Sequence, residues 1–425
     1  MKNLKVVFSF LLAVGLFATM STLITSCDDD EPPALTLVSL TAGSIDLNGA
    51  TSATGVPTGA TITAEFSTEV DPASVSAITL ERQFDAAAYA STITVDGKTV
   101  TINPNTDFST GTLFILEFGA GLKSTGGKTL TTAIERNFST EGTFAVPGAV
   151  AHWTFEDNAN DIIGSYDAAA AQIVDITYAA GRKADAGKAA SFNGTTSIIE
   201  ISNGDQLMNT QNFTLSFWVK ATEHTDNVDK GHFVMGLGAF YGFQFEIFGG
   251  YGGWKLATRY EFNNAGTINT ITEDNAFNGD GKDATNGGWQ GFAFTKDLTA
   301  SGGPSAIIKD KWVHMVYTYN STTKQGIYYA NGEKMRELDF DLWPDGDNKT
   351  FITGLKYGGV EPDVKNELAF GFIQSRAGTL WDDEPWGGYA QASANHFKGL
   401  LDDVIIYHKV LTAAEVTSMY NSGKP

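Results

Sequence analysis

Aromatic side chains and acids occur together in two Gly-rich stretches of the chain, residues 220–309 and 342–396. The C–H faces of sugar rings stack on indole and phenol rings, and sugar hydroxyls pair with Asp, Asn and Gln side chains. Glycine also lets a loop backbone come close to a ligand. The alternative is that these rings only pack the long segments against the rest of the domain. The candidate ligand-binding residues are Tyr251, Trp254, Trp289, Trp381 and Trp386.

Three acids are candidates for a structural calcium site, because Ca²⁺ prefers carboxylate and carbonyl oxygens. Asp157 and Asp161 follow the first apolar run of the C-terminal region, and Asp402 lies in its last run. If the two runs form neighbouring strands, the three carboxylates converge. Solvated surface acids are the alternative reading of all three. Loop acids are alternative calcium ligands: Asp280, Asp283, Asp345 and Asp347.

The patterns of several common catalytic sites are missing from the sequence. The six histidines form no His-Glu-x-x-His motif, no Gly-x-Ser-x-Gly occurs, and there is one cysteine. His152 and His314 alternate within apolar runs, which is typical of structural histidines. We therefore expect a protein that is not an enzyme.

The N-terminus predicts export followed by lipid anchoring. A short basic segment precedes an apolar run at 6–20, which is shorter than the ~20 residues of a membrane span. The run 24–27, Ile-Thr-Ser-Cys, resembles a bacterial lipobox and implies lipidation of Cys27. We expect residues 1–26 to be a lipoprotein signal peptide and residues 27–34 to be an acidic tether.

Four acids directly after Cys27 resemble the surface-export signal of Bacteroidota lipoproteins. The resemblance implies an outer-membrane protein that is lipid-anchored and exposed on the cell surface. The formal net charge of −21 disfavours nucleic acid and anionic membrane surfaces as partners, because their phosphates require basic patches. Membrane attachment is then expected through the lipid anchor only.

Residues 35–141 consist of short alternating runs separated by regular turn signals, which predicts about seven strands in a β-sandwich. Asp96-Gly97 predicts a hairpin with a type I′ turn. The segments 65–75 and 137–140 resemble the bacterial Ig-like domain of surface-layer proteins. The resemblance implies a rigid arm, and residues 142–148 form a short linker that limits the orientation of the next domain.

Residues 149–425 contain six segments whose order closely resembles that of laminin-G-like, concanavalin A-like jelly rolls. The resemblance implies two antiparallel sheets packed face to face, with long loop insertions in the two Gly-rich stretches. Thr412 and Glu415, after the last segment, have the spacing of a helix capping box. The fold class is therefore expected to be all-β, an Ig-like sandwich followed by a jelly roll. The six segments are 150–157, 189–194, 213–220, 311–319, 327–333 and 399–408.

The resemblance leaves the function open, because this family includes glycan-binding modules, adhesion modules and domains attached to enzymes. Glucanases with this fold carry a Glu-x-Asp-x-x-Glu strand, and this chain has none. The first hypothesis is a non-catalytic surface lipoprotein that binds polysaccharide beside an outer-membrane uptake system. The second is a protein–protein interaction subunit or adhesin of an outer-membrane complex. A glycoside hydrolase or lyase with an unrecognised site is a third.

Overall fold

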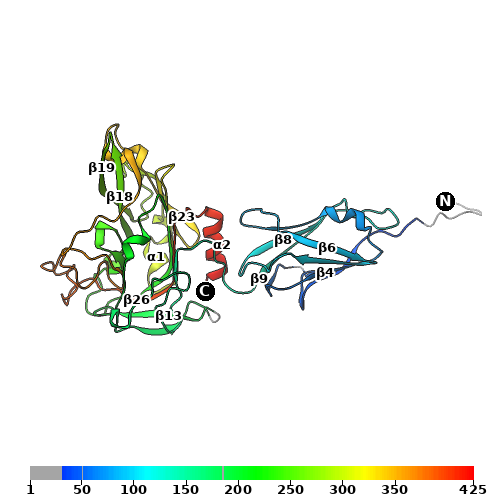
Figure 1. Ribbon diagram of the computed structural model, residues 1–425, viewed down its shortest axis with the longest axis horizontal. Coiled ribbons are helices and arrows are strands. Elements are labelled where there is room, and N and C mark those ends of the chain that lie inside the picture. Colours follow the sequence, from blue (N-terminus) through cyan, green and yellow to red (C-terminus); the bar gives the residue numbers. More distant parts are fainter. Residues whose placement is uncertain (1–30, 50, 184–185) are drawn as a thin grey trace, which may run out of the picture.

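The computed structural model describes residues 31–49, 51–183 and 186–425. Two β-sandwiches follow one another along the chain, so the expected all-β fold class is confirmed (Figure 1). Cys27, the predicted lipidation site, lies outside the described residues, and its lipidation stays a prediction. Neither α-helix in the described part of the chain is long and apolar enough to span a bilayer.

The N-terminal sandwich packs a five-stranded sheet, β2-β1-β4-β7-β6, against a four-stranded sheet, β3-β9-β8-β5, within the described residues. Its strands bury every second residue, so that in β4 Ile62 and Phe66 face the core and Glu65 lies at the surface. The strands are β1 (Leu37–Ala42), β2 (Ile45–Asp46), β3 (Ala53–Val56), β4 (Ile62–Phe66), β5 (Ile78–Arg82), β6 (Ser91–Asp96), β7 (Thr99–Pro104), β8 (Leu113–Phe118) and β9 (Ile134–Thr140).

The hairpin predicted at Asp96-Gly97 is present between β6 and β7, with a different turn. Asp96 pairs with Thr99, so the two turn residues are Gly97 and Lys98. Only Gly97 has a positive φ, 58°, whereas a type I′ turn needs positive φ at both positions. The type I′ assignment is therefore wrong, although the hairpin is correct.

The C-terminal sandwich packs a nine-stranded sheet against an eight-stranded sheet in the described part of the chain. The first has the order β12-β13-β26-β15-β21-β22-β23-β20, with β10 beside β26. The second has the order β11-β14-β25-β16-β17-β18-β19, with β24 beside β18. The strands are β10 (Ala151–Trp153), β11 (Ile173–Val174), β12 (Thr177–Ala180), β13 (Lys188–Asn193), β14 (Ile198–Ile201), β15 (Asn212–Ala221), β16 (His232–Leu237), β17 (Phe243–Ile247), β18 (Trp254–Asn264), β19 (Thr267–Phe277), β20 (Phe292–Thr295), β21 (Val313–Asn320), β22 (Gln325–Ala330), β23 (Glu333–Asp339), β24 (Ile352–Leu355), β25 (Leu368–Phe370) and β26 (Lys398–Tyr407).

The first Gly-rich stretch, expected to be a loop insertion, is mostly sheet. Residues 232–277 form β16 to β19, which make up half of the eight-stranded sheet, and β20 joins the other sheet. The second stretch, 342–396, contributes only the short strands β24 and β25 between irregular segments. The long loops are therefore 278–291 and 371–397.

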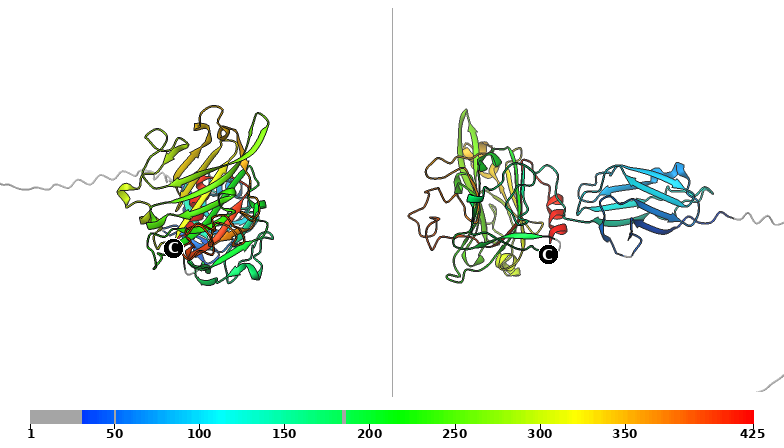
Figure 2. Two further views of the ribbon diagram at one scale, coloured as in Figure 1. Left: turned by 90° about the vertical axis from the view of Figure 1, so that its left-hand side faces the viewer. Right: turned by 60° about the horizontal axis from the view of Figure 1, so that its bottom comes forward.

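A short helix, α2 (Ala413–Gly423), closes the chain on the outer face of the nine-stranded sheet, and α1 (Ser305–Ile308) is a single turn. The predicted capping box is confirmed, because Thr412 Oγ1 accepts from Glu415 N and the Glu415 carboxylate accepts from Thr412 N. Helix α2 lies between the two sandwiches in both figures (Figures 1 and 2). It packs there together with Phe144 and Val146 of the linker.

Candidate functional site

The outer face of the eight-stranded sheet forms the floor of a groove. Along β17 the side chains of Phe243 and Phe245 face the core, and those of Gln244 and Glu246 face the opposite way. Strands β16, β18 and β19 add further outward side chains by the same alternation. The floor residues are Phe233, Gln244, Glu246, Lys255, Ala257, Thr272 and Asp274.

Two long loops raise aromatic walls beside this floor and enclose a volume of about 850 Å³. Trp289 comes from the loop 278–291, and Trp381 and Trp386 come from the loop 371–397. Trp289 is 50% exposed and Trp386 is 42% exposed, so each presents much of its ring to solvent. Three of the five predicted aromatic residues therefore line one groove.

Contacts with neighbouring rings hold the two tryptophans of the second loop in place. The rings of Trp381 and Trp386 lie 5.0 Å apart at an angle of 50°, and Trp381 also contacts Phe240 at 5.6 Å. Trp289 is fixed differently, because its Nε1 donates to Glu273 Oε1 at 2.9 Å. Anchored rings of this kind lose little conformational entropy when a ligand stacks on them.

The charged groups of the floor form a compact cluster around one lysine. Lys255 Nζ lies 3.2 Å from Glu246 Oε1 and 3.2 Å from Asp274 Oδ2. Burial raises the pKa of Glu246, and the charge of Lys255 offsets part of that effect. Gln244 is buried, and its Oε1 has no hydrogen-bond partner among the described residues. The floor thus holds a paired charge cluster and the amide side chain of Gln244 beside the aromatic walls.

Tyr251 and Trp254 are not part of the groove, which corrects the prediction for both. Trp254 begins β18, is completely buried, and packs against Phe277 at 4.7 Å inside the sandwich. Tyr251 is 2% exposed and contacts His232 at 5.6 Å. Because both rings are buried in the core, neither can stack on a ligand.

Asp157 and Asp161 do not form the calcium site that was expected. Both oxygens of Asp161 accept from backbone amides, among them His152 N at 2.9 Å and Gly164 N at 3.0 Å. Asp157 is exposed and pairs with Lys188 Nζ at 2.7 Å. Asp161 therefore stabilises the turn after β10, and both of its carboxylate oxygens are already engaged by backbone amides instead of a cation.

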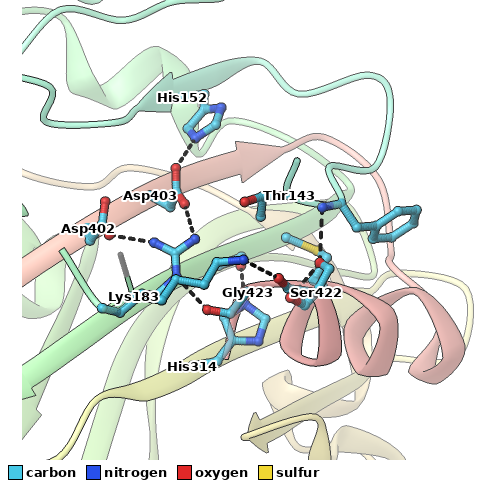
Figure 3. A network of polar contacts seen from close by, with 12 residues as sticks. Thr143, His152, Lys183, His314, Asp402, Asp403, Ser422 and Gly423 are labelled. Atoms are coloured by element: carbon cyan, nitrogen blue, oxygen red, sulfur yellow. Dashed lines mark hydrogen bonds and ion pairs between the residues drawn. The ribbon is translucent and has the colours of Figure 1, made fainter. Parts of the chain in front are cut away.

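Asp402 is also engaged elsewhere, in a buried network on the nine-stranded sheet (Figure 3). Its carboxylate contacts Arg182 Nη1, while Arg182 Nη2 donates to Asp403 at 2.6 Å and His152 Nε2 lies 2.9 Å from the same Asp403. Burial and the charge of Asp403 raise the pKa of Asp402 to about 8, and Arg182 offsets part of this shift. Arg182 occupies the place that a cation would need.

The three acids therefore do not fit a shared calcium ion. Within the described residues, no group of three or more His, Cys, Asp and Glu side chains is placed to hold a metal ion. Of the alternative loop acids, Asp280 and Asp283 accept hydrogen bonds within their own loop, from Lys282 N and Thr285 N. Calcium binding by this chain stays a prediction without an assigned site.

Several groove residues were missed by the sequence analysis, among them Phe233, Gln244, Lys255 and Asn395. Strict alternation in 243–247, Phe-Gln-Phe-Glu-Ile, was the available signal for Gln244 and Glu246. It marks a strand with one polar face, and that face is the groove floor. No local pattern marks Asn395, which reaches the groove only through the path of its loop.

Comparison with known proteins assigns a family to the N-terminal sandwich. Residues 30–140 match the family model described as the bacterial Ig-like domain. No curated protein matches the chain. The Ig-like assignment of the N-terminal sandwich is therefore confirmed.

Solved structures similar to this chain include two binding domains and one domain of an arabinanase. The receptor binding domain of botulinum neurotoxin type G is 13% identical, with 64% of this chain and 51% of that chain covered and a TM-score of 0.35. The binding domain of Paraclostridial Mosquitocidal Protein 1 is 16% identical, with 65% of this chain and 52% of that chain covered and a TM-score of 0.38. The third is domain 4 of AbnA, a GH43 extracellular arabinanase from Geobacillus stearothermophilus, in complex with arabinotriose. It is 19% identical, with 64% of this chain and 98% of that chain covered and a TM-score of 0.33. This chain spans about half the length of the first two of these domains.

Proposed function

We propose that this protein is a non-catalytic, lipid-anchored cell-surface protein whose groove binds glycan. The observation that carries the proposal is the set of three tryptophans, Trp289, Trp381 and Trp386, around one polar floor. The exposed rings of Trp289 and Trp386 and the partly buried ring of Trp381 supply stacking faces. The side chains of Gln244 and Asn395, which line the groove, supply hydrogen-bonding groups for sugar hydroxyls.

A glycan suits this groove better than a wholly apolar ligand. The floor carries the Glu246–Lys255–Asp274 cluster, which an apolar ligand would desolvate without offering hydrogen bonds in return. A sugar chain offers hydroxyls to these groups and C–H faces to the indoles. The two carboxylates flank Lys255 and are charge-paired with it, so the site favours recognition over acid–base chemistry.

Substitution of the exposed tryptophans tests the proposal. We expect Trp386→Ala and Trp289→Ala to weaken binding to the best ligand of a polysaccharide panel about tenfold each, because a stacked ring contributes on the order of 1 kcal/mol. Their melting temperatures should change less than that of a core variant, because about half of each residue is exposed. Isothermal titration calorimetry and thermal unfolding measure the two quantities.

Two further variants serve as controls in this experiment. Phe351→Ala removes a ring that is 36% exposed and lies outside the groove, and it should leave affinity unchanged. Trp254→Ala removes a core ring and should lower stability by about 3–5 kcal/mol. If no polysaccharide binds, or if the groove variants bind as tightly as the wild type, glycan recognition in the groove is wrong. The protein–protein alternative would then be preferred.

We further propose that the chain is held at the outer membrane through Cys27, beside a polysaccharide uptake system. The support is the lipobox-like run that ends at the only cysteine of the sequence. Cys27→Ser should move the protein from the membrane fraction to the soluble fraction. Retention of the variant in the outer membrane after a high-salt wash would contradict lipid anchoring.

A further inference from the structure

A second cavity, of about 280 Å³, adjoins the groove at the edge of the sandwich where β19 approaches β23. The two cavities share Trp289 and Phe292, so a ligand stacked on Trp289 borders both. The polar lining of the second cavity comes from Asn278, Asp280, Lys282 and Arg336. Arg336 belongs to β23, opposite Thr295 of β20.

Arg336 is a buried cation with few partners. The residue is 3% exposed, and among the described residues its only side-chain hydrogen bond runs from Nη2 to Asn278 Oδ1, at 3.3 Å. Its Nε has no partner, and no carboxylate of the described residues forms an ion pair with it. A guanidinium has five N–H donors, so most of its hydrogen-bonding capacity is unused.

The other buried arginine of the domain, in contrast, has acceptors for its guanidinium N–H groups. Arg182 donates to Asp402, to Asp403 and to the carbonyl oxygen of Gly423. Arg336 has aromatic neighbours instead, with its Cζ 3.8 Å from the centre of the Phe292 ring and 5.6 Å from that of Phe277. Cation–π contacts offset part of the cost of burying the charge, but they leave the N–H donors unpaired.

The electrostatics of the cavity favour an incoming anion. Burial lowers the pKa of Arg336 to about 10, and the charge of Asp280 offsets only part of that effect. The Asp280 carboxylate is turned to its own loop, where it accepts from Lys282 N at 3.0 Å and Asn278 Nδ2 at 3.1 Å. A bound oxyanion would give Arg336 the charge-assisted hydrogen bonds that the protein itself does not provide.

We propose that this cavity binds the carboxylate or sulfate group of an acidic sugar unit, at the end of the groove marked by Trp289. The inference rests on the proposed glycan-binding function of the groove. It restricts the ligand to glycans that contain an acidic sugar unit. The paired N–H groups of the Arg336 guanidinium match the oxygens of an oxyanion, and the shared Trp289 ring can stack on the sugar that bears this oxyanion.

Thermal unfolding of the purified full chain tests the proposal with small probes. Galacturonate, galactose 6-sulfate, galactose and sodium sulfate are added at millimolar concentrations and constant ionic strength. At least one of the two acidic sugars should raise the melting temperature more than galactose or sodium sulfate does. Equal effects of all four, or a larger effect of sodium sulfate alone, would overturn the proposal.

Arg336→Met is the decisive variant. It should reduce affinity for the protective acidic sugar at least tenfold, because the loss of charge-assisted hydrogen bonds has that effect. Its own melting temperature should be unchanged or higher, because an unpaired buried charge has been removed. The control is Arg136→Met, which removes a half-buried arginine of the Ig-like sandwich that donates to Asn48 and lies outside both cavities. Unchanged acidic-sugar affinity in Arg336→Met would refute the proposal.

The outcome is separable from that of the proposed function. If Trp386→Ala lowers affinity for a neutral polysaccharide and Arg336→Met changes nothing, the groove binds glycan and the acidic subsite is wrong. If Arg336→Met abolishes protection by galacturonate while the tryptophan variants bind polysaccharide normally, the cavity is an acidic-sugar site and the groove proposal fails.

Discussion

Trp254 and Trp386 come from similar Gly-rich sequence, yet one is a core residue and the other a groove residue. In 254–262, Trp-Lys-Leu-Ala-Thr-Arg-Tyr-Glu-Phe, the large apolar residues recur at every second or fourth position, which indicates a strand with Trp254 on its inner face. No such alternation surrounds Trp386. Local periodicity could therefore have separated the two rings, whereas the convergence of Trp289 with Trp386 depends on loop paths that the sequence does not reveal.

Asp402 gives a residue-scale prediction about metal binding. Asp402→Ala removes the buried carboxylate that contacts Arg182, and we expect a loss of about 3 kcal/mol in the free energy of unfolding. The loss should be the same with and without EDTA, because the partner of Asp402 is a guanidinium. Chemical denaturation of both proteins measures it. If EDTA removes the difference between the wild type and the variant, Asp402 is a metal ligand after all.

Elements were predicted best where their signals are local. The capping box at Thr412 and Glu415 and the hairpin after Asp96 both follow from a few neighbouring residues, and both are present. The glycine-rich composition of the stretch 232–277 predicts a loop insertion, but long-range pairing makes it four strands of a sheet. Pairing partners such as β16 and β25, more than 130 residues apart in sequence, leave no trace in a short window.

Four buried histidines of the C-terminal domain predict acid sensitivity. Burial lowers the pKa of His224 and His396 to about 4, and that of His232 and His314 to about 3. In the unfolded chain these pKa values return to about 6.5, so the unfolded state binds more protons below that pH. The stabilisation of the folded state by these neutral histidines is therefore complete above pH 6.5 and is lost as the pH falls toward 4.

We expect the melting temperature to drop steeply between pH 6.5 and pH 4, with each histidine contributing up to about 1.4 kcal/mol per pH unit. The pKa values of Glu246 and Asp402 are raised, so these two carboxyl groups favour the folded state as the pH falls and reduce the slope. His314→Gln should show a shallower pH dependence than the wild type. Parallel curves for the two proteins would mean that His314 does not titrate as inferred.

At the scale of the whole molecule, the groove and the Ig-like sandwich lie on opposite sides of the C-terminal domain. The linker and α2 pack on the outer face of the nine-stranded sheet, through Val316, Ile405 and Tyr407. The groove lies on the outer face of the other sheet. The N-terminal sandwich therefore extends away from the groove, as Figures 1 and 2 show. If Cys27 is anchored, this arrangement presents the groove away from the membrane.

The linker holds this arrangement through one phenylalanine. Phe144 is 3% exposed, contacts the ring of Phe84 in the Ig-like sandwich at 4.9 Å, and donates its backbone N–H to Ser422 Oγ of α2 at 3.0 Å. Both domains thus contact the same residue. Phe144→Ala removes the ring but keeps the chain length, so it tests whether packing or linker length restricts the two domains.

Truncation of a buried Phe costs about 3–5 kcal/mol, which is enough to raise the population of an undocked linker more than a hundredfold. We expect Phe144→Ala to broaden the distance distribution in small-angle X-ray scattering and to speed proteolytic cleavage within 141–149. Sugar binding in the groove should be unaffected, because the groove lies on the eight-stranded sheet, whereas Phe144 packs on the nine-stranded sheet. Val38→Ala, at an exposed position of β1, is the matched control and should scatter like the wild type. Identical scattering and cleavage for Phe144→Ala would show that the short linker alone, and not the packing of Phe144, sets the direction in which the groove faces.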